Sequence, residues 1–469
     1  MAAALIGLGV SLALFLKLER SGKPETAVRL LAIILIFELL AAPNEAGQPV
    51  GLFRVPVGVD LRPGDFIIPV AVLARILARP LPHWIGVPAM LWASFYAWYS
   101  VAVVTGIAWG NPMSDVIFQS RSIVSLAGAM FVAAGVDASK IFAPESIARF
   151  GRFFGWIAVV IAVAHLTLTP LSLNVPVFAV KQLGILGGDA RTVLPVLGMF
   201  TLAAEVLNQR RRPSVLIPGA AVFMTPFVAV QAGPYLAALT LVLLVVGFSL
   251  TSTWRRRVGL KALDIAIVGS ALVTLGAASI FLSGGQSPAV VAQFEDAVLS
   301  DSQQTTTNER YQLWDEAVEK FYESPVWGYG VGVKGTIERS WPQPSGKATF
   351  HNIIFDISMR SGGAGVLLFL GSLVATVVAA LLVWFRCRND TVAVMSLACM
   401  LGMTAILSRG GVSSMLEASR MSLAVGLLSG LILSGWRYMK VDEARQERLE
   451  GSQSGLRLPE EGPFEYANS

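Results

Sequence analysis

The chain has 469 residues, of which 54% are hydrophobic and only 14% charged, with a formal net charge of +5. Soluble domains carry about 25% charged residues, so this chain has too few charges to cover a water-soluble globule. Its apolar residues come in blocks close to the length that spans a bilayer, about 17–25 residues. These figures exclude a soluble enzyme, a secreted disulfide scaffold and a disordered protein, and they predict an all-α polytopic membrane protein.

Twelve or thirteen apolar blocks are expected to span the membrane, the total depending on two short blocks near the N-terminus. The predicted spans are 2–16, 27–43, 65–80, 86–107, 120–138, 153–170, 191–207, 215–230, 234–251, 260–283, 363–385, 391–408 and 420–436. They divide the chain into four parts. These are an N-terminal bundle of about ten helices (1–283), a long polar loop (284–362), three C-terminal helices (363–440) and a polar tail (441–469) expected to be disordered.

Most of the 36 Lys and Arg residues fall in alternate connections, among them the clusters 210–212 and 255–257. Because an excess of basic residues marks the cytoplasmic side, we expect the C-terminus in the cytoplasm and the long loop on the opposite face. The side of the N-terminus depends on the number of spans. The basic residues therefore report orientation, and they give no reason to expect nucleic-acid binding.

The long loop holds ten acidic and six basic residues, and its sequence predicts structure. Thr306 and Glu309 have the spacing of a capping box, with Thr306 as the N-cap of a helix that ends at Pro325. One stripe of this helix is apolar, and it consists of Tyr311, Trp314, Val318, Phe321 and Tyr322. The protein's own spans and the membrane surface are both possible partners for the stripe, and we favour the spans. A second helix is expected to begin near Phe350 and to continue into the next span.

The chain has only three histidines. His83 lies at the end of the third span, where a structural role is expected. His165 lies inside an apolar span, where an ionisable residue is either functional or a neutral, hydrogen-bonded imidazole. His351 lies on the long loop in the run Phe350-His351-Asn352, and it is a candidate general base because its pKa is normally near neutrality.

Two arginines on the loop side stand near predicted helix N-termini, where a cation opposes the helix dipole. Arg191 opens the seventh span just after Asp189, and Arg310 follows Glu309 in the loop helix. An external anion and an ion pair with the neighbouring acid both explain these positions. Further cations expected on this side, mostly at span ends, include Lys181, Arg121, Arg360, Arg409 and Arg420.

Several motifs of other chemistries are missing from the sequence. It has no D-x-D or E-x-D pair, no Walker loop, no G-x-S-x-G, no H-E-x-x-H and no C-x-x-C. We therefore expect neither a metal nor an organic cofactor.

Three segments together resemble the O-antigen ligase and polymerase superfamily of bacterial inner-membrane proteins. They are 310–314 (Arg-Tyr-Gln-Leu-Trp), 324–330 (Ser-Pro-Val-Trp-Gly-Tyr-Gly) and His351-Asn352, after which nine residues precede Gly362 and Gly365. The specific resemblance covers roughly 306–366, and elsewhere only the topology is similar.

The resemblance implies a multi-pass glycosyltransferase of the inner membrane. In this family a glycan passes from an undecaprenyl-diphosphate carrier to an acceptor hydroxyl at the periplasmic face. It implies His351 and Arg310 as catalytic residues, and Arg191, Arg310 and Lys181 as ligands of the diphosphate. Supporting roles fall to Asn352, Gly362 and Gly365, and contact with sugar rings falls to Trp314, Trp327 and Tyr329.

Two reactions fit this resemblance, with membrane lipids and the donor as common partners. A polysaccharide polymerase transfers the chain to another carrier-linked glycan, sometimes with a chain-length regulator, and an O-antigen ligase transfers it to lipid A-core. We prefer the polymerase. The alternative from another class is a transporter or flippase of lipid-linked glycan. The sugars, the linkage and the oligomeric state have no signal in the sequence.

Overall fold

The computed structural model describes residues 2–40, 55–56, 60–61, 63–79, 86–174, 188–208, 212–223, 232–258, 304–335, 350, 352–411 and 419–453. Within these ranges, side chains are described except for 2–7, 40, 55–56, 60–61, 161–174, 188, 232–235, 255, 304–310 and 451–453. The described part is almost entirely helical. It also holds one antiparallel pair of two-residue strands, β1 (Val55–Pro56) and β2 (Asp60–Leu61).

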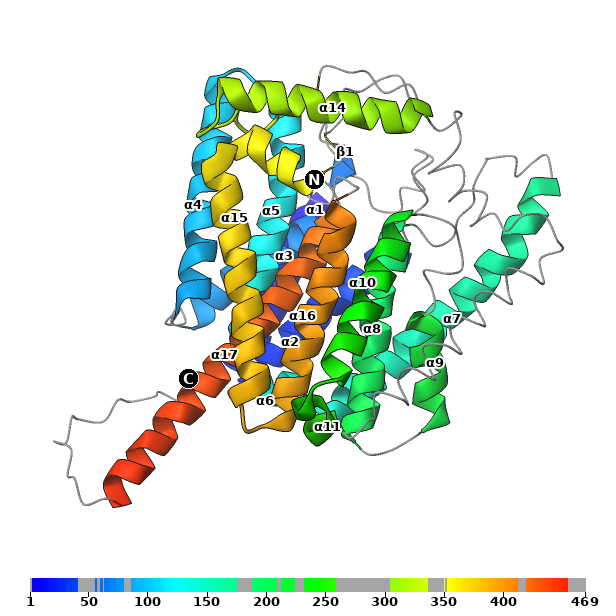
Figure 1. The fold of residues 1–469 in the computed structure, drawn as a ribbon, viewed down its shortest axis with the longest axis vertical. Coiled ribbons are helices and arrows are strands. Elements are labelled where there is room, and N and C mark those ends of the chain that lie inside the picture. Colours follow the sequence, from blue (N-terminus) through cyan, green and yellow to red (C-terminus); the bar gives the residue numbers. More distant parts are fainter. Residues whose placement is uncertain are drawn as a thin grey trace.

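The helices of the first half of the chain are α1 (Ala2–Arg20), α2 (Pro24–Leu40), α3 (Pro63–Ala78), α4 (Val87–Ala108), α5 (Met113–Ala134), α6 (Ala138–Ile141), α7 (Pro144–Asn174) and α8 (Gly188–Leu207). Those of the second half are α9 (Pro213–Phe223), α10 (Ala232–Ser249), α11 (Ser252–Val258), α14 (Gln304–Glu323), α15 (Ile353–Arg386), α16 (Asp390–Gly410) and α17 (Ser419–Gln453). The long helices run side by side as a bundle (Figure 1).

Among the described residues, six helices are long and apolar enough to cross a membrane, namely α4, α5, α8, α15, α16 and α17. The pair α10 and α11, bent by 84°, is a seventh candidate. The prediction of an all-α polytopic membrane protein is therefore confirmed. The total of twelve or thirteen spans stays a prediction, because the expected span 260–283 lies outside the described residues.

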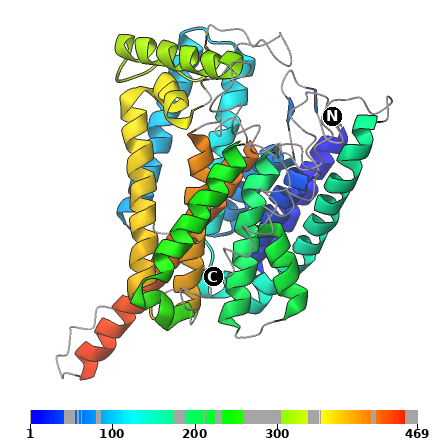
Figure 2. The same cartoon turned by 45° about the vertical axis from the view of Figure 1, so that its right-hand side comes forward.

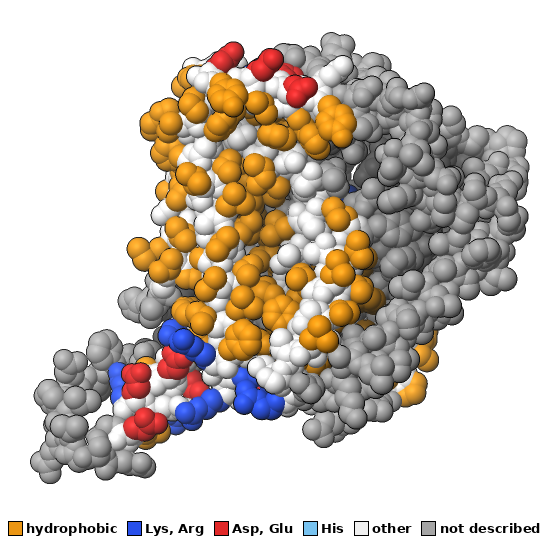
Figure 3. All heavy atoms as spheres, in the orientation of Figure 1, with side chains coloured by type: hydrophobic (Ala, Val, Ile, Leu, Met, Phe, Trp, Pro, Cys, Tyr) orange, Lys and Arg blue, Asp and Glu red, His pale blue; other side chains and the backbone are white. Residues whose placement is uncertain are grey.

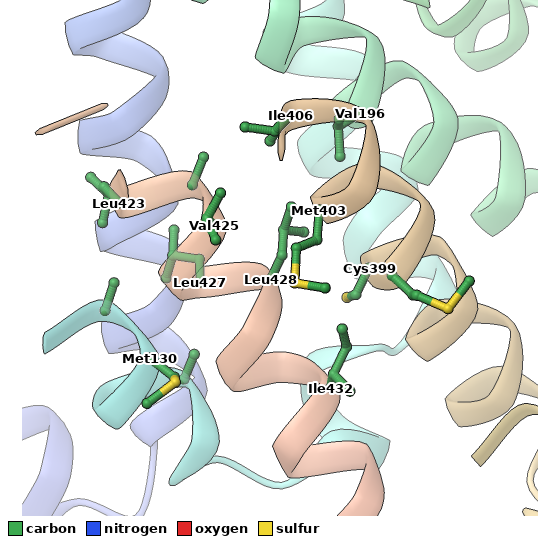
Figure 4. Packing of buried hydrophobic residues seen from close by; sticks show 14 of the residues in the cluster. Met130, Val196, Cys399, Met403, Ile406, Leu423, Val425, Leu427, Leu428 and Ile432 are labelled. Atoms are coloured by element: carbon green, nitrogen blue, oxygen red, sulfur yellow. The ribbon is translucent and has the colours of Figure 1, made fainter. Parts of the chain in front are cut away.

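The centre of the bundle is the contact between α17 and α5. A Cβ added at Gly430 of α17 would lie 2.5 Å from the carbonyl oxygen of Met130, and one at Gly426 would clash with the carbonyl of Leu126. The two backbones therefore approach as closely as small residues permit in membrane helices. Figure 4 shows the packing around this contact, where Leu428 and Ile432 of α17 lie close to Met403 and Cys399 of α16.

Helix α14 lies across one end of the bundle, over the ends of α4 and α15 (Figures 1 and 2). The opposite end carries α11 and the start of α16, which are joined by an ion pair of 2.8 Å between Arg257 Nη1 and Asp390 Oδ1. Between these ends, the face seen in Figure 3 is covered mainly by apolar side chains, and charged side chains gather above and below it. This distribution is that of a protein surrounded by lipid.

The helix expected to begin near Phe350 and to continue into the next span is α15. It begins at Ile353 and passes residue 362, the expected end of the loop, with a kink at Gly362. The tail was expected to be disordered from 441, but α17 continues to Gln453. Residues 441–453 include several Glu, Arg and Gln residues, which have high intrinsic helix propensity. The expectation of disorder rested on the polar character of the tail and did not take this propensity into account. Residues 454–469 lie outside the described part.

The loop helix also differs from its prediction. The predicted end before Pro325 is confirmed, but α14 begins at Gln304, two residues before the expected N-cap Thr306. The buried side of α14 carries Leu313 and Ala317. Only two members of the predicted stripe, Trp314 and Phe321, are partly buried, and the other three are exposed.

Candidate functional site

Asn352 fixes the start of α15 against the end of α16. Its Oδ1 accepts a hydrogen bond from the backbone N–H of Ile354 (2.9 Å), and so it satisfies a donor that the helix end leaves free. Its Nδ2 donates to the backbone oxygen of Gly411 (3.1 Å). His351 itself lies outside the described residues, but as the neighbour of Asn352 it is attached to this junction.

Asp189, in the first turn of α8, binds arginines from two other helices. Its Oδ1 lies 3.0 Å from Nη1 of Arg409 on α16, and its Oδ2 lies 3.0 Å from Nη2 of Arg420 on α17. Nη1 of Arg409 also donates to Thr192 Oγ1 (2.9 Å). This carboxylate therefore joins three helices at the end of α16 that also contacts Asn352.

Arg191 follows Asp189 by two residues on α8 and is buried, with 3% of its surface exposed. We use the name arginine cluster for the ion-paired Asp189, Arg409 and Arg420, together with Arg191 on the same turn of α8. Arg420 also lies 3.4 Å, through Nη1, from the backbone oxygen of Glu38. In the two ion pairs, two guanidinium groups share the single carboxylate of Asp189. Because a guanidinium group can donate several hydrogen bonds to anionic oxygens, such a cluster suits an anion.

Glu38 was the clearest acid within an apolar span of the sequence. Its Oε1 accepts a hydrogen bond from the backbone N–H of Gly64 (2.6 Å), in the first turn of α3. A carboxylate at this position satisfies a free helix donor and interacts favourably with the helix dipole. The described contacts therefore give Glu38 a capping role.

The loop segment after α14, residues 324–335, is held tightly against the bundle, and we call it the strap. The backbone N–H of Val331 donates to the carbonyl of Ala102 on α4 (2.9 Å), and that of Tyr329 donates to Met359 on α15 (2.7 Å). Gln119 of α5 accepts from the N–H of Gly332 through Oε1, at 2.8 Å. The strap therefore contacts three membrane helices through its own backbone.

Glycines make this contact possible. Gly330 (φ 77°) packs on Gly106 of α4 so closely that a Cβ on either residue would clash with the other segment's backbone. At the kink of α15, Gly362 (φ 65°) packs in the same way on the carbonyl of Val326. The left-handed backbone at Gly330 and Gly362 is readily adopted only by glycine. Gly365 lies one turn further along, with Trp98 in van der Waals range of an added Cβ (3.4 Å).

The three predicted sugar-contacting aromatics take part in this packing. Trp314 donates from Nε1 to the carbonyl of Phe350 (2.8 Å), and Trp327 stacks on Trp98 with ring centroids 4.7 Å apart. Tyr329 packs edge-on to Trp109, and its hydroxyl donates to Glu323. Desolvation, and secondly the Glu323 carboxylate, raise the pKa of Tyr329 to about 12. Trp327 is still half exposed, so one of its faces is available to a ligand.

The structure brings together only part of the predicted set. Asn352, Gly362 and Gly365 lie on α15, and Arg191 lies in the arginine cluster. Arg310 lies on α14, but its side chain is outside the described part, as are Lys181 and the whole of His351. Of the other predicted loop-side cations, Arg121 and Arg360 form ion pairs with Asp65 (3.8 Å) and Asp356 (3.7 Å) respectively.

Sequence reasoning missed Asp189, Arg409 and Arg420 as members of the site. The available signal was that both arginines lie at span ends on the same side as Arg191, but spacing along the chain does not show that they share a carboxylate. Within the described residues, no group of three or more His, Cys, Asp or Glu side chains is placed to hold a metal ion.

A comparison with protein families matches residues 217–370 to the family described as O-antigen ligase. This region contains α10, α14, the strap and the first half of α15, and so includes the His-Asn pair and both of its glycines. No curated protein matches the chain. The match covers this part of the chain and supports its resemblance to the O-antigen ligase and polymerase superfamily.

Proposed function

We propose that the protein transfers a glycan from an undecaprenyl-diphosphate carrier to an acceptor hydroxyl at the periplasmic face of the inner membrane. The observation that carries this proposal is the junction between Asn352 and Gly411. Through it, the loop that matches the ligase family is joined to the end of α16, whose Arg409 lies in the arginine cluster. In this proposal, His351 and the arginine cluster belong to one site.

The arginine cluster suits the leaving group. When the acceptor oxygen bonds to the anomeric carbon, the bond from that carbon to the diphosphate oxygen breaks, and negative charge develops on the diphosphate. Guanidinium groups bind phosphate oxygens through paired hydrogen bonds. Arg191, Arg409 and Arg420 are therefore candidate ligands of the departing diphosphate. Arg310 and Lys181 are further candidates from the resemblance.

His351 would take the proton from the acceptor hydroxyl as this oxygen attacks. A single displacement of this kind inverts the configuration at the anomeric carbon. Asn352 would position His351, because its own hydrogen bonds fix the backbone at the start of α15. Trp327 offers an exposed aromatic face to a sugar ring.

The first test is glycan transfer by purified protein with a carrier-linked donor. We expect His351→Ala and Arg310→Ala to insert and fold normally but to lose transfer. Lys320→Ala is the matched control on α14, because Lys320 is only paired within the helix with Glu316, at 2.6 Å, and it should keep activity. Full activity of both test variants would overturn the catalytic assignment. Absence of transfer by the unaltered protein would favour the transporter or flippase.

The reaction is proposed to need no metal, because arginines neutralise the leaving group. A chelator should therefore leave transfer unchanged. Strong inhibition that magnesium or manganese reverses would contradict this part of the proposal.

The acceptor distinguishes a polymerase, which we prefer, from a ligase. A deletion strain that makes core lipopolysaccharide bearing one repeat unit would indicate a polymerase. Polymer that stays on the carrier lipid would indicate a ligase, which joins the chain to lipid A-core.

A further inference from the structure

Helix α14 carries an apolar stripe that remains exposed in the described part of the structure. Tyr311 is 56% exposed, Val318 40% and Tyr322 78%. At about 100° per residue, these three side chains lie within about 40° of one another on the helix. The predicted role of the stripe, packing on the protein's own spans, is therefore wrong for these residues.

The stripe lies between a buried side and an acidic side of α14. On one side of it lie the partly buried Trp314 and Phe321, followed by the buried Leu313 and Ala317. On its other side lie three exposed acids, Asp315, Glu319 and Glu323. The exposed apolar stripe is thus the border between the side that rests on the protein and the side that faces water.

The stripe is continuous with the lipid-facing surface of the bundle. The strap leads from the end of α14 to the outer face of α4, where the half-exposed Trp327 stacks on Trp98. On the same two helices, Val101 of α4 and Leu367 of α15 are exposed (44% and 73%), and both helices are long and apolar enough to cross a membrane. Figure 3 shows many apolar side chains on α14 and further down this face, with white atoms between them.

Exposed aromatic residues also occur at the end of α4 and on the strap. Trp109, at the end of α4, is 56% exposed, and Trp327 of the strap is 54% exposed. Tryptophan and tyrosine prefer the headgroup region of a bilayer, where an apolar ring and a polar group are both accommodated. Helix α14 also lies across the bundle rather than along it (Figures 1 and 2), as expected of a helix in the plane of the interface.

We propose that α14 lies on the membrane surface, with Tyr311, Val318 and Tyr322 inserted at the headgroup level of the leaflet around α4 and α15. The acids beside the stripe oppose attraction to anionic lipid, so insertion rests on apolar and aromatic contact and on the covalent connection of α14 to the bundle. This inference is independent of the proposed reaction, because it concerns only how the loop is seated.

The test uses the full-length protein in phosphatidylcholine nanodiscs, with a nitroxide label at Tyr322→Cys or Val318→Cys. Glu319→Cys is the matched control on the acidic side of the same helix. The native Cys387 and Cys399 are buried, and replacing both with alanine provides a single-site background. Accessibility of the label to oxygen, which concentrates in lipid, is compared with accessibility to a water-soluble nickel chelate.

We expect the ratio of oxygen to nickel accessibility at 318 and 322 to exceed that at 319 several-fold. Equal ratios at all three positions would place the stripe in water, and a label at 322 that neither reagent reaches would place it against protein. Either result would overturn the proposal. Since both labelled positions are exposed, loss of folding is not expected, and the melting temperature of each labelled protein is the check.

Discussion

Asn352 donates a hydrogen bond to the backbone oxygen of Gly411 across 3.1 Å, while its own oxygen caps α15. One side chain thereby caps the start of α15 and links it to the end of α16. Substitutions can separate these two tasks, because only the amide nitrogen is a donor.

For Asn352 we predict different effects of aspartate and alanine. Asn352→Asp keeps the cap, because a carboxylate is also a good N-cap acceptor, but it loses the donor to Gly411. Asn352→Ala loses both, and should lower the free energy of unfolding by about 0.5–2 kcal/mol. We expect both variants to transfer glycan about five- to tenfold more slowly, the equivalent of one hydrogen bond. Thermal unfolding and the transfer rate together measure this, and a fully active Asn352→Asp protein would contradict it.

For the arginine cluster we predict that Arg409→Gln weakens transfer by about ten- to a hundredfold, because a hydrogen bond to a charged group contributes about 1.5–3 kcal/mol. Arg409→Lys should recover part of the loss, since the charge returns without the paired geometry. The steady-state rate at several donor concentrations measures the effect. Arg256→Gln is the control, because Arg256 is exposed on α11 at the other end of the bundle. Equal rates for the two glutamine variants would exclude Arg409 from the site.

For the strap we predict that Gly106→Ala destabilises the protein by about 1–3 kcal/mol, the usual cost of overpacking, because the new methyl group would meet the carbonyl oxygen of Val331. Gly247→Ala is the matched control within a membrane helix. A Cβ there meets nothing within 4 Å, so this change should be neutral or stabilising by up to about 1 kcal/mol. Thermal unfolding in detergent compares them, and similar melting temperatures would argue against the close contact.

For Tyr329 we predict an unusual titration. Its pKa of about 12 lies above the ordinary value of 10.0, so folding favours the neutral phenol. The stabilisation is complete below the pKa of the unfolded chain and is lost as the pH rises through the folded pKa. Glu323→Gln should lower the pKa of Tyr329 towards its ordinary value, as measured by difference absorbance of phenolate against a Tyr329→Phe protein. An unchanged titration in Glu323→Gln would show that Glu323 does not contribute.

The sequence alone was sufficient for the class of fold and for the position of the main helices, because the apolar blocks correspond directly to spans. It also indicated that the helix after Phe350 runs into the next span, which α15 confirms. Local sequence signals predicted the ends of helices less accurately. The capping box at Thr306 misplaced the start of α14, since backbone hydrogen bonding can extend a helix beyond its best local cap.

The site was less accessible to sequence reasoning. Arg191 was predicted from its place at a helix start. Arg409 and Arg420 come from helices far along the chain, and only folding brings them to Asp189. The same holds for the strap. Its segment 324–330 was noted only for the family resemblance, whereas the residues it contacts, Gly106 and Ala102, lie in an apolar stretch of α4 that carries no local signal.

The bond from Val331 to Ala102 has a consequence for how the loop can be studied. A carbonyl inside a membrane helix accepts from the strap, and other strap bonds end on α5 and α15, so an excised loop would lose the partners that shape it. Helix α14, the strap and the His-Asn pair should therefore be expressed and tested together with the membrane bundle. A soluble fragment cut from 284–362 would carry the signature residues without the site.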